Sequence, residues 1–271
     1  MDIFEQLLQE KYGVSEEHKI VEDKVPSTMQ GHITAKDFLK DLDNAIVEKA
    51  ERNKWRPSTF FSPSGMQCSR AMYYKGLGTD LDETKVNPNL VGITDVGNAR
   101  HDKLQETIAE SRVIQYLDVG RYVKEHKLPL EIREKQGNEV LLRDKERNLS
   151  FKCDGIIKYQ DEIYVLEIKT ESSKKFKERQ GVNPAHIDQA TAYALALEIN
   201  QVMFLYECRD NSMKKAYVFE VTDNLKDEMQ RKIDRVLWAM EKNEIPPRYQ
   251  PYISKGACQY CNYRQRCKKT K

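Results

Sequence analysis

One stretch of the sequence, residues 151–170, constrains the fold of this chain more than any other. It contains two short apolar runs, 151–159 and 162–169, separated by Gln160 and Asp161. Apolar runs of this length that flank a polar pair are typical of two strands joined by a tight turn. The sequence therefore predicts a β-hairpin here.

Charged residues interrupt both apolar runs of this hairpin. Asp154 lies in the first run, and Glu167 lies in the second, two residues before Lys169. Because side chains alternate between the faces of a strand, Glu167 and Lys169 point the same way and Ile168 points the opposite way. Carboxylates among core residues are costly unless they are paired or bound to a cation. We therefore predict a site for a hard metal ion and a phosphate on this hairpin.

The composition is that of a charged surface around a substantial core. Hydrophobic residues make up 39% of the 271 residues and charged residues 32%. Lys and Arg number 45 against 43 Asp and Glu, so the overall charge does not indicate nucleic acid, and any basic surface is local. We find no apolar run that could span a bilayer, and the N-terminus resembles neither a signal nor a transit peptide. We therefore expect a cytoplasmic protein.

The remaining patterns predict an α/β protein with a mixed sheet flanked by helices. We expect a helical N-terminal region, 1–55, and a domain, 56–271, that carries the hairpin. The further predicted helices cover residues 62–78, 93–117, 185–199 and 225–242. The further predicted strands cover residues 120–124, 128–133, 139–142, 202–208 and 216–221. Ser62 and Pro63 are good starting residues for the first of these helices.

Three polar residues outside the hairpin extend the candidate site. His101 lies in the predicted helix 93–117, and Gln189 and Tyr193 lie four residues apart on one face of the predicted helix 185–199. A lone histidine on a helix is more often simply exposed. Aspartate and glutamate oxygens suit Mg or Mn, and an imidazole ligand favours Mn. The predicted set is His101, Asp154, Glu167, Lys169, Gln189 and Tyr193.

These residues resemble a known family. Asp154 with Glu167-Ile168-Lys169 looks like the signature of the PD-(D/E)XK nuclease superfamily, and Gly97-x-x-x-His101 and Gln189-x-x-x-Tyr193 look like flanking motifs of its RecB-like branch. The resemblance covers about residues 60–267 and implies a restriction-endonuclease-like core. Cys153 stands where the signature has proline, which weakens the literal pattern but leaves the chemistry unchanged.

The resemblance also implies roles for the residues. His101, Asp154 and Glu167 would bind the metal ion, and we add the main-chain carbonyl of Ile168 to this ligand set. Lys169 would be catalytic together with the two acids. Gln189 and Tyr193 would support the active site and contact DNA.

Two basic segments offer contacts to a nucleic-acid backbone. Lys174 and Lys175 belong to a basic loop directly after the hairpin, and the C-terminal tail interleaves Arg and Lys with Tyr260 and Tyr263. Either segment could bind phosphates or stack bases, or could simply be solvated. We include Lys174 and Lys175 among the candidate DNA-binding residues.

The six cysteines divide into two groups. Cys153 and Cys208 lie inside strand patterns and are predicted to be buried apolar residues. The other four are Cys68, Cys258, Cys261 and Cys267, a set that could hold zinc or an iron–sulfur cluster or remain uncoordinated. One distant cysteine joined to three close ones resembles the 4Fe-4S staple of RecB-like nucleases, including CRISPR-associated exonucleases and AddB-type helicase–nucleases. We expect such a cluster, with zinc as the alternative.

The resemblance implies a Mg- or Mn-dependent deoxyribonuclease that acts as an exonuclease on single-stranded DNA or DNA ends. Such an enzyme would serve recombination, repair, replication or CRISPR adaptation, with protein partners from those processes. The absence of a GxxxxGK[ST] loop favours a phage or CRISPR-associated exonuclease over a helicase–nuclease fusion, which places it in the host cytoplasm if phage-encoded. The alternative is a non-catalytic DNA-binding or scaffold module acting with a partner enzyme, against which the intact Asp154, Glu167 and Lys169 argue.

Overall fold

The computed structural model describes residues 34–52, 58–82, 86–136, 139–248, 258 and 261–270. The chain divides into two compact units, 1–46 and 47–271. Helix α2 (Ala35–Arg52) confirms the helical prediction for part of the N-terminal region, whereas residues 1–33 lie outside the described residues. The fold described below belongs to the second unit.

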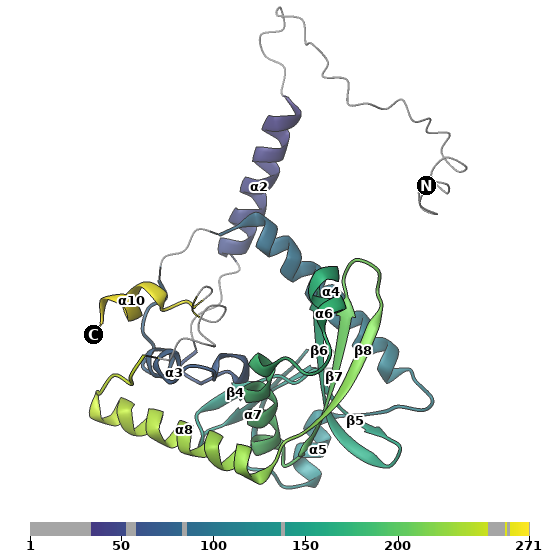
Figure 1. Cartoon of the computed structure of the whole chain (residues 1–271), viewed down its shortest axis with the longest axis vertical. Helices are drawn as coiled ribbons and strands as arrows, with labels where there is room; N and C mark the ends of the chain where they lie inside the picture. Colours follow the sequence, from purple (N-terminus) through teal and green to yellow (C-terminus); the bar gives the residue numbers. More distant parts are fainter. Residues whose placement is uncertain are drawn as a thin grey trace, which may run out of the picture. The chain divides into compact units, whose positions relative to one another are not determined.

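The second unit combines helices with two β-sheets (Figure 1). Its helices are α3 (Ser69–Gly76), α4 (Pro88–Ala109), α5 (Val119–Glu125), α6 (Ser173–Glu178), α7 (Ile187–Leu197), α8 (Asp223–Lys242) and α10 (Arg264–Lys269), with 3-10 turns at Pro63–Gly65 and Pro184–His186. Its strands are β1 (Gln115–Leu117), β2 (Glu131–Gln136), β3 (Glu139–Asp144), β4 (Leu149–Phe151), β5 (Gly155–Tyr159), β6 (Glu162–Glu171), β7 (Gln201–Cys208) and β8 (Lys214–Glu220). No described helix is long and apolar enough to cross a membrane.

The larger sheet is mixed and has the strand order β1-β5-β6-β7-β8. Strands β6 and β7 are parallel and are connected through α7, whereas the other neighbouring strands of this sheet are antiparallel. The smaller sheet, β2-β3-β4, is antiparallel. The predicted α/β class with a mixed sheet flanked by helices is confirmed.

The two faces of β6 are covered by different helices. Leu166 and Ile168 pack with Leu104 of α4 in one apolar cluster, and Val165 belongs to the main core on the opposite face. Helix α7 packs on that opposite face, and its buried alanines allow a close approach to the sheet. Glu167 and Lys169 therefore point towards α7, which confirms the predicted alternation.

The hairpin is confirmed in part. Gln160 and Asp161 both have left-handed backbone angles, φ 49° and 66°, as a two-residue type I′ turn requires. The first strand is shorter than predicted, because Leu149–Phe151 forms β4 in the smaller sheet and only Gly155–Tyr159 forms β5. Asp154 therefore lies at the junction between two sheets and not within a strand.

The strand predicted at residues 120–124 is wrong, because this segment forms helix α5. The Asp118 side chain accepts a hydrogen bond from the Arg121 N–H at 2.8 Å and so caps the helix. Val119 and Tyr122 lie three residues apart and are both buried, as on one face of a helix. This capping and periodicity overrode the β propensity of the segment.

The helix predicted at residues 93–117 is displaced. Helix α4 begins earlier, because Asn87 accepts hydrogen bonds from two main-chain N–H groups and Pro88 occupies the first turn. It ends at Ala109, and residues 115–117 form the edge strand β1. His101 consequently lies in the C-terminal half of α4.

Two smaller predictions also need correction. The helix predicted from Ser62 is broken into a 3-10 turn and α3, and Cys68 lies immediately before α3 instead of within it. The basic segment that follows the hairpin is not a loop, since residues 173–178 form α6.

Candidate active site

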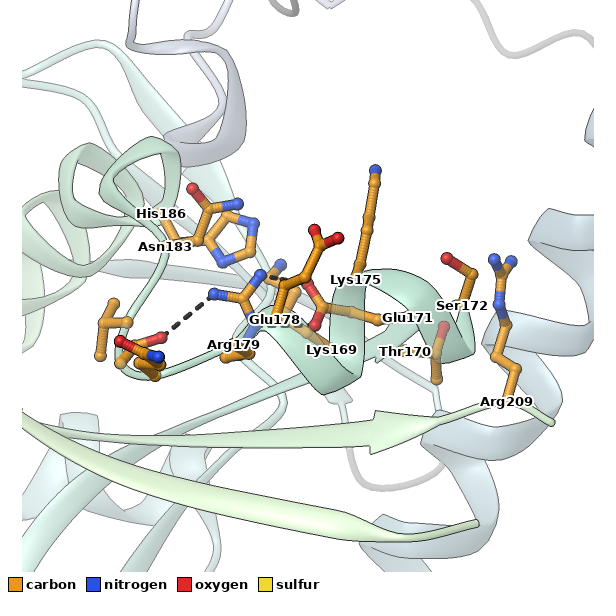
Figure 2. Close-up of a pocket in the computed structure, with 13 residues that line it drawn as sticks. Lys169, Thr170, Glu171, Ser172, Lys175, Glu178, Arg179, Asn183, His186 and Arg209 are labelled. Carbon is orange, nitrogen blue, oxygen red and sulfur yellow. Dashed lines mark hydrogen bonds and ion pairs between the residues drawn. The ribbon is translucent and has the colours of Figure 1, made fainter. Parts of the chain in front are cut away.

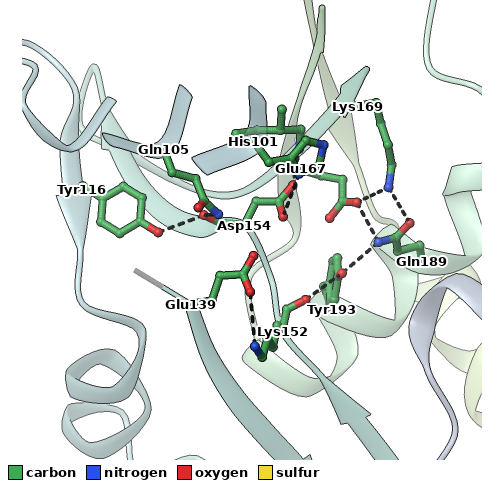
Figure 3. Close-up of polar contacts among 11 residues, drawn as sticks. His101, Gln105, Tyr116, Glu139, Lys152, Asp154, Glu167, Lys169, Gln189 and Tyr193 are labelled. Atoms are coloured by element: carbon green, nitrogen blue, oxygen red, sulfur yellow. Dashed lines mark hydrogen bonds and ion pairs between the residues drawn. The ribbon is translucent and has the colours of Figure 1, made fainter. Parts of the chain in front are cut away.

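Asp154 is held by contacts from three elements (Figure 3). Its main-chain carbonyl accepts hydrogen bonds from Gln105 Nε2 at 2.8 Å and from the Tyr116 hydroxyl at 2.9 Å. Its carboxylate Oδ2 accepts from the main-chain N–H of Ile168 at 2.5 Å. A Cβ on Gly155 would lie 2.6 Å from the Tyr116 ring, so only glycine leaves room for this contact. These contacts fix Asp154 beside β6.

Helix α4 is anchored to the sheet next to His101. Arg100 donates hydrogen bonds to the buried carboxylate of Glu207 on β7, one of them from Nε at 3.1 Å. A Cβ at Gly97 would lie 3.3 Å from Thr170 Oγ1, so the glycine allows α4 to approach β6 closely. The pair and the close approach together set the position of His101.

The imidazole of His101 faces Asp154. Its Nδ1 lies 3.6 Å from Asp154 Oδ1, which is beyond a good hydrogen bond. Burial lowers the pKa of His101, but the carboxylates of Asp154 and Glu167 act in the opposite direction and raise the pKa above its ordinary value. The histidine therefore experiences the negative charge that would also attract a cation.

Glu167 is almost completely buried, and only one of its two carboxylate oxygens accepts hydrogen bonds. Its Oε1 accepts hydrogen bonds from Lys169 Nζ and from Gln189 Nε2, the latter at 2.7 Å. Its Oε2 has no hydrogen-bond partner within the described residues. Burial raises the pKa of Glu167, and the charge of Asp154 raises it further, against the lowering effect of Lys169. A buried, unpartnered carboxylate oxygen is an unfavourable feature that a bound cation would relieve.

Gln189 and Tyr193 support Glu167 and Lys169. Gln189 Oε1 accepts from Lys169 Nζ at 3.2 Å, and Gln189 Nε2 also donates to the Tyr193 hydroxyl at 2.8 Å. That hydroxyl in turn donates to the main-chain carbonyl of Lys152 at 3.1 Å. Both side chains are buried, so their placement favours a supporting role over direct contact with DNA.

The donor set fits a hard divalent cation. The structure gathers the predicted side chains His101, Asp154, Glu167, Lys169, Gln189 and Tyr193 at one place. Two carboxylates and an imidazole are ligands that suit Mg or Mn. Within the described ranges, no group of three or more His, Cys, Asp or Glu side chains is already arranged to hold a metal ion. Binding would therefore require these side chains to move.

Three of the four candidate ligand cysteines influence the fourth, Cys261, electrostatically. Burial raises the pKa of the Cys261 thiol, and the charges of Cys68, Cys258 and Cys267 raise it further, but within the described residues these thiols do not form a group arranged to hold a metal ion. By contrast, Cys153 and Cys208 are buried in the core, as predicted. The fold thus brings the distant Cys68 within electrostatic range of Cys261.

Contacts other than cysteine also hold the C-terminal segment in place. The rings of Tyr74 on α3 and Tyr263 lie 5.6 Å apart, and Arg70 Nε donates to the carbonyl of Pro246 at 2.7 Å. The Asp82 carboxylate accepts from the main-chain N–H groups of Gln265 and Arg266 at the start of α10. The segment is therefore packed against α3.

The predicted DNA-binding lysines have different surroundings. Both Lys174 and Lys175 are exposed on α6. Only Lys175 lines a cleft beside Lys169. The structure thus separates two residues that the sequence pattern grouped together.

Several residues that position this site were not among the sequence predictions. Gln105 and Tyr116 hold the carbonyl of Asp154, and Arg100 pairs with Glu207. One signal was available, because Gln105 lies four residues after His101 on the same helical face. The contacts of Tyr116 and Glu207 depend on strand pairing and carry no local signal.

The chain belongs to the PD-(D/E)XK nuclease superfamily, whose family model matches residues 92–268. This match confirms the predicted superfamily, and the chain is accordingly a nuclease by family. No curated protein sequence matches the chain significantly.

Solved structures show weaker similarity. The structure of SSO0001 has 16% identity and a TM-score of 0.45, over 83% of this chain and 93% of that chain. The alkaline exonuclease LHK-Exo from Laribacter hongkongensis has 14% identity and a TM-score of 0.42, over 74% of this chain and 93% of that chain. Its complex with dAMP has 12% identity and a TM-score of 0.44, over 75% of this chain and 93% of that chain. Similarity at this level does not extend to substrate or activity.

Replacing the buried acid should stabilise the metal-free protein at alkaline pH. The pKa of Glu167 is raised from 4.5 to about 7 in the folded state. The unfolded chain therefore ionises first, and stability is lost as the pH rises through this interval. Glu167→Gln removes that loss, so we expect a melting temperature about 4 °C or more above wild type at pH 8 and little difference at pH 4.

Differential scanning fluorimetry in the presence of a chelator measures this effect. Glu162→Gln, at the exposed start of the same strand, is the control and should change neither value. A gain for Glu167→Gln that is equal at both pH values would contradict the ionisation argument.

Proposed function

We propose that this chain is a Mg- or Mn-dependent DNA exonuclease that hydrolyses phosphodiester bonds at single-stranded or end-bearing DNA. The observation that carries the proposal is the convergence of Asp154, Glu167 and Lys169, with one Glu167 oxygen buried and unpartnered within the described residues. His101, Asp154, Glu167 and the Ile168 carbonyl would hold the metal ion. When bound, the ion would polarise the phosphodiester and lower the pKa of a bound water.

The residues of the chain have separate tasks in this proposal. The Lys169 ammonium offsets negative charge that develops on the scissile phosphate, and Gln189 holds this ammonium beside Glu167. Tyr193 and Gln189 keep the Glu167 carboxylate in one orientation. Processing of DNA ends in recombination, repair, replication or CRISPR adaptation would follow from such an activity.

Digestion of end-labelled, end-blocked and circular DNA tests the proposal. With Mg or Mn, the wild-type protein should degrade end-labelled DNA, whether single-stranded or end-bearing. It should spare circular DNA unless it also has endonuclease activity. A chelator should abolish all cleavage. Intact DNA under every condition would contradict catalysis and would favour a non-catalytic DNA-binding module.

We also propose that Cys68, Cys258, Cys261 and Cys267 hold a structural 4Fe-4S cluster. The electrostatic influence of Cys68 and of two C-terminal cysteines on Cys261, and the suitability of four thiolates as ligands of such a cluster, support this proposal. The cluster would tie the C-terminal segment to α3, where other contacts already place it. Metal analysis of anaerobically purified protein decides between iron and zinc.

A further inference from the structure

A cleft opens beside Lys169 at the carboxyl end of β6 (Figure 2). Its volume is about 600 Å³, which is in the range of pockets that hold small ligands. Strands β6 and β7 are parallel, so their carboxyl ends meet here and the residues that follow them line the same space. The cleft is therefore continuous with the candidate active site.

Two of the basic or titratable side chains that line the cleft already bond to other residues of the protein. Arg179 donates from Nε to Glu171 at 2.7 Å and lies 4.2 Å above the ring of Tyr206. His186 Nδ1 lies 3.0 Å from the Tyr206 hydroxyl. Burial, with the nearby charges of Lys169 and Arg179, lowers the pKa of His186 to about 3, so it adds no charge. These groups form a wall of the cleft.

Two cations in the cleft remain available. Within the part of the chain that the structure describes, the side chains of Lys175 and Arg209 make no hydrogen bond and no ion pair. Figure 2 shows Lys175 extending from α6 and Arg209 rising beside Ser172. Asp210 lies near Arg209 but accepts hydrogen bonds from Ser173, and Glu178 adds one exposed negative charge.

We propose that this cleft binds a second phosphate group of the DNA strand, next to the phosphate at Lys169, through Arg209 and Lys175. The proposal rests on the function proposed above. A guanidinium and an ammonium without internal partners are suited to phosphate, and Ser172 lines the same space. Because phosphate contacts do not distinguish between bases, the cleft would bind DNA of any sequence equally well. The group is either a terminal phosphate or an internal phosphodiester.

Oligonucleotide binding without cleavage tests the cleft. Fluorescence anisotropy would use labelled single strands, a chelator and the Lys169→Ala background. We expect Arg209→Gln to weaken binding about tenfold, as for a lost charge-assisted hydrogen bond, and to reduce the salt-dependence slope by about 0.7. Lys175→Gln should act in the same direction. Lys177→Gln, on α6 but outside the cleft, should change neither quantity.

Comparing strands with and without a terminal phosphate, and circles, identifies which kind of phosphate the cleft binds. An effect of Arg209→Gln confined to strands with a 5′- or 3′-phosphate assigns the cleft to a terminal phosphate, and an equal effect on circles assigns it to an internal phosphodiester. If the Arg209→Gln/Lys175→Gln double variant binds all strands as tightly as its background, the cleft proposal is wrong even when the wild type cleaves DNA. If wild type cleaves nothing but binding depends on Arg209, the cleft stands and the nuclease proposal fails.

Discussion

Lys169→Ala is expected to lower the rate of DNA cleavage about a thousandfold while leaving the fold and DNA binding largely intact. The side chain is partly exposed, so its removal opens little core volume. It does remove the only ammonium among the described residues that is bonded to Glu167. A positioned charge at a transferring phosphate is typically worth two to three orders of magnitude in rate, which sets the expected effect.

The conservative variant makes this prediction sharper. Lys169→Arg keeps the positive charge, but its planar fork cannot reproduce the single nitrogen shared between Glu167 and Gln189. We therefore expect little rescue. Lys158→Ala, on the neighbouring strand β5, is the matched control and should cleave like wild type. Single-turnover kinetics with Mg or Mn gives the rates, and a Lys169→Ala rate within tenfold of wild type would contradict the assigned role.

The second large effect is expected from Cys261→Ala, which should abolish cluster content and lower the melting temperature by ten degrees or more. The proposed cluster would link Cys68 to the C-terminal cysteines and so close a loop through most of the domain. In the chain-entropy description, a cross-link over such a loop contributes about 5 kcal/mol. A protein of this size shifts by roughly 2–4 °C for each kcal/mol.

Absorbance, metal analysis and thermal melting of anaerobic samples measure this effect. Cys208→Ala is the control, because Cys208 is buried in the core and bonded to Ser173, away from the other thiols. It should keep full metal content. Unchanged metal content and melting temperature in Cys261→Ala would falsify the structural role of the cluster. A colourless protein that contains zinc would show that the four cysteines bind zinc and not an iron–sulfur cluster.

The hairpin shows which structural features can be predicted from local sequence patterns. Alternation along β6 is a property of the strand itself, so the shared direction of Glu167 and Lys169 could be read from the sequence. The spacing of Gln189 and Tyr193 likewise follows from helical periodicity. Where local signals competed, as in the capped segment 119–125 or at the two ends of α4, the propensity of single residues misled the prediction.

The sequence alone determined the family signature and the chemical types at the site, because Asp154 and Glu167-x-Lys169 lie within one short segment. Only the tertiary structure decided which groups are buried without partners and which cations are available. Glu167 lies on the face of β6 that α7 covers, and one of its carboxylate oxygens has no partner among the described residues. The cleft with Arg209 exists because β6 and β7 pair in parallel, a long-range contact that no local pattern specifies.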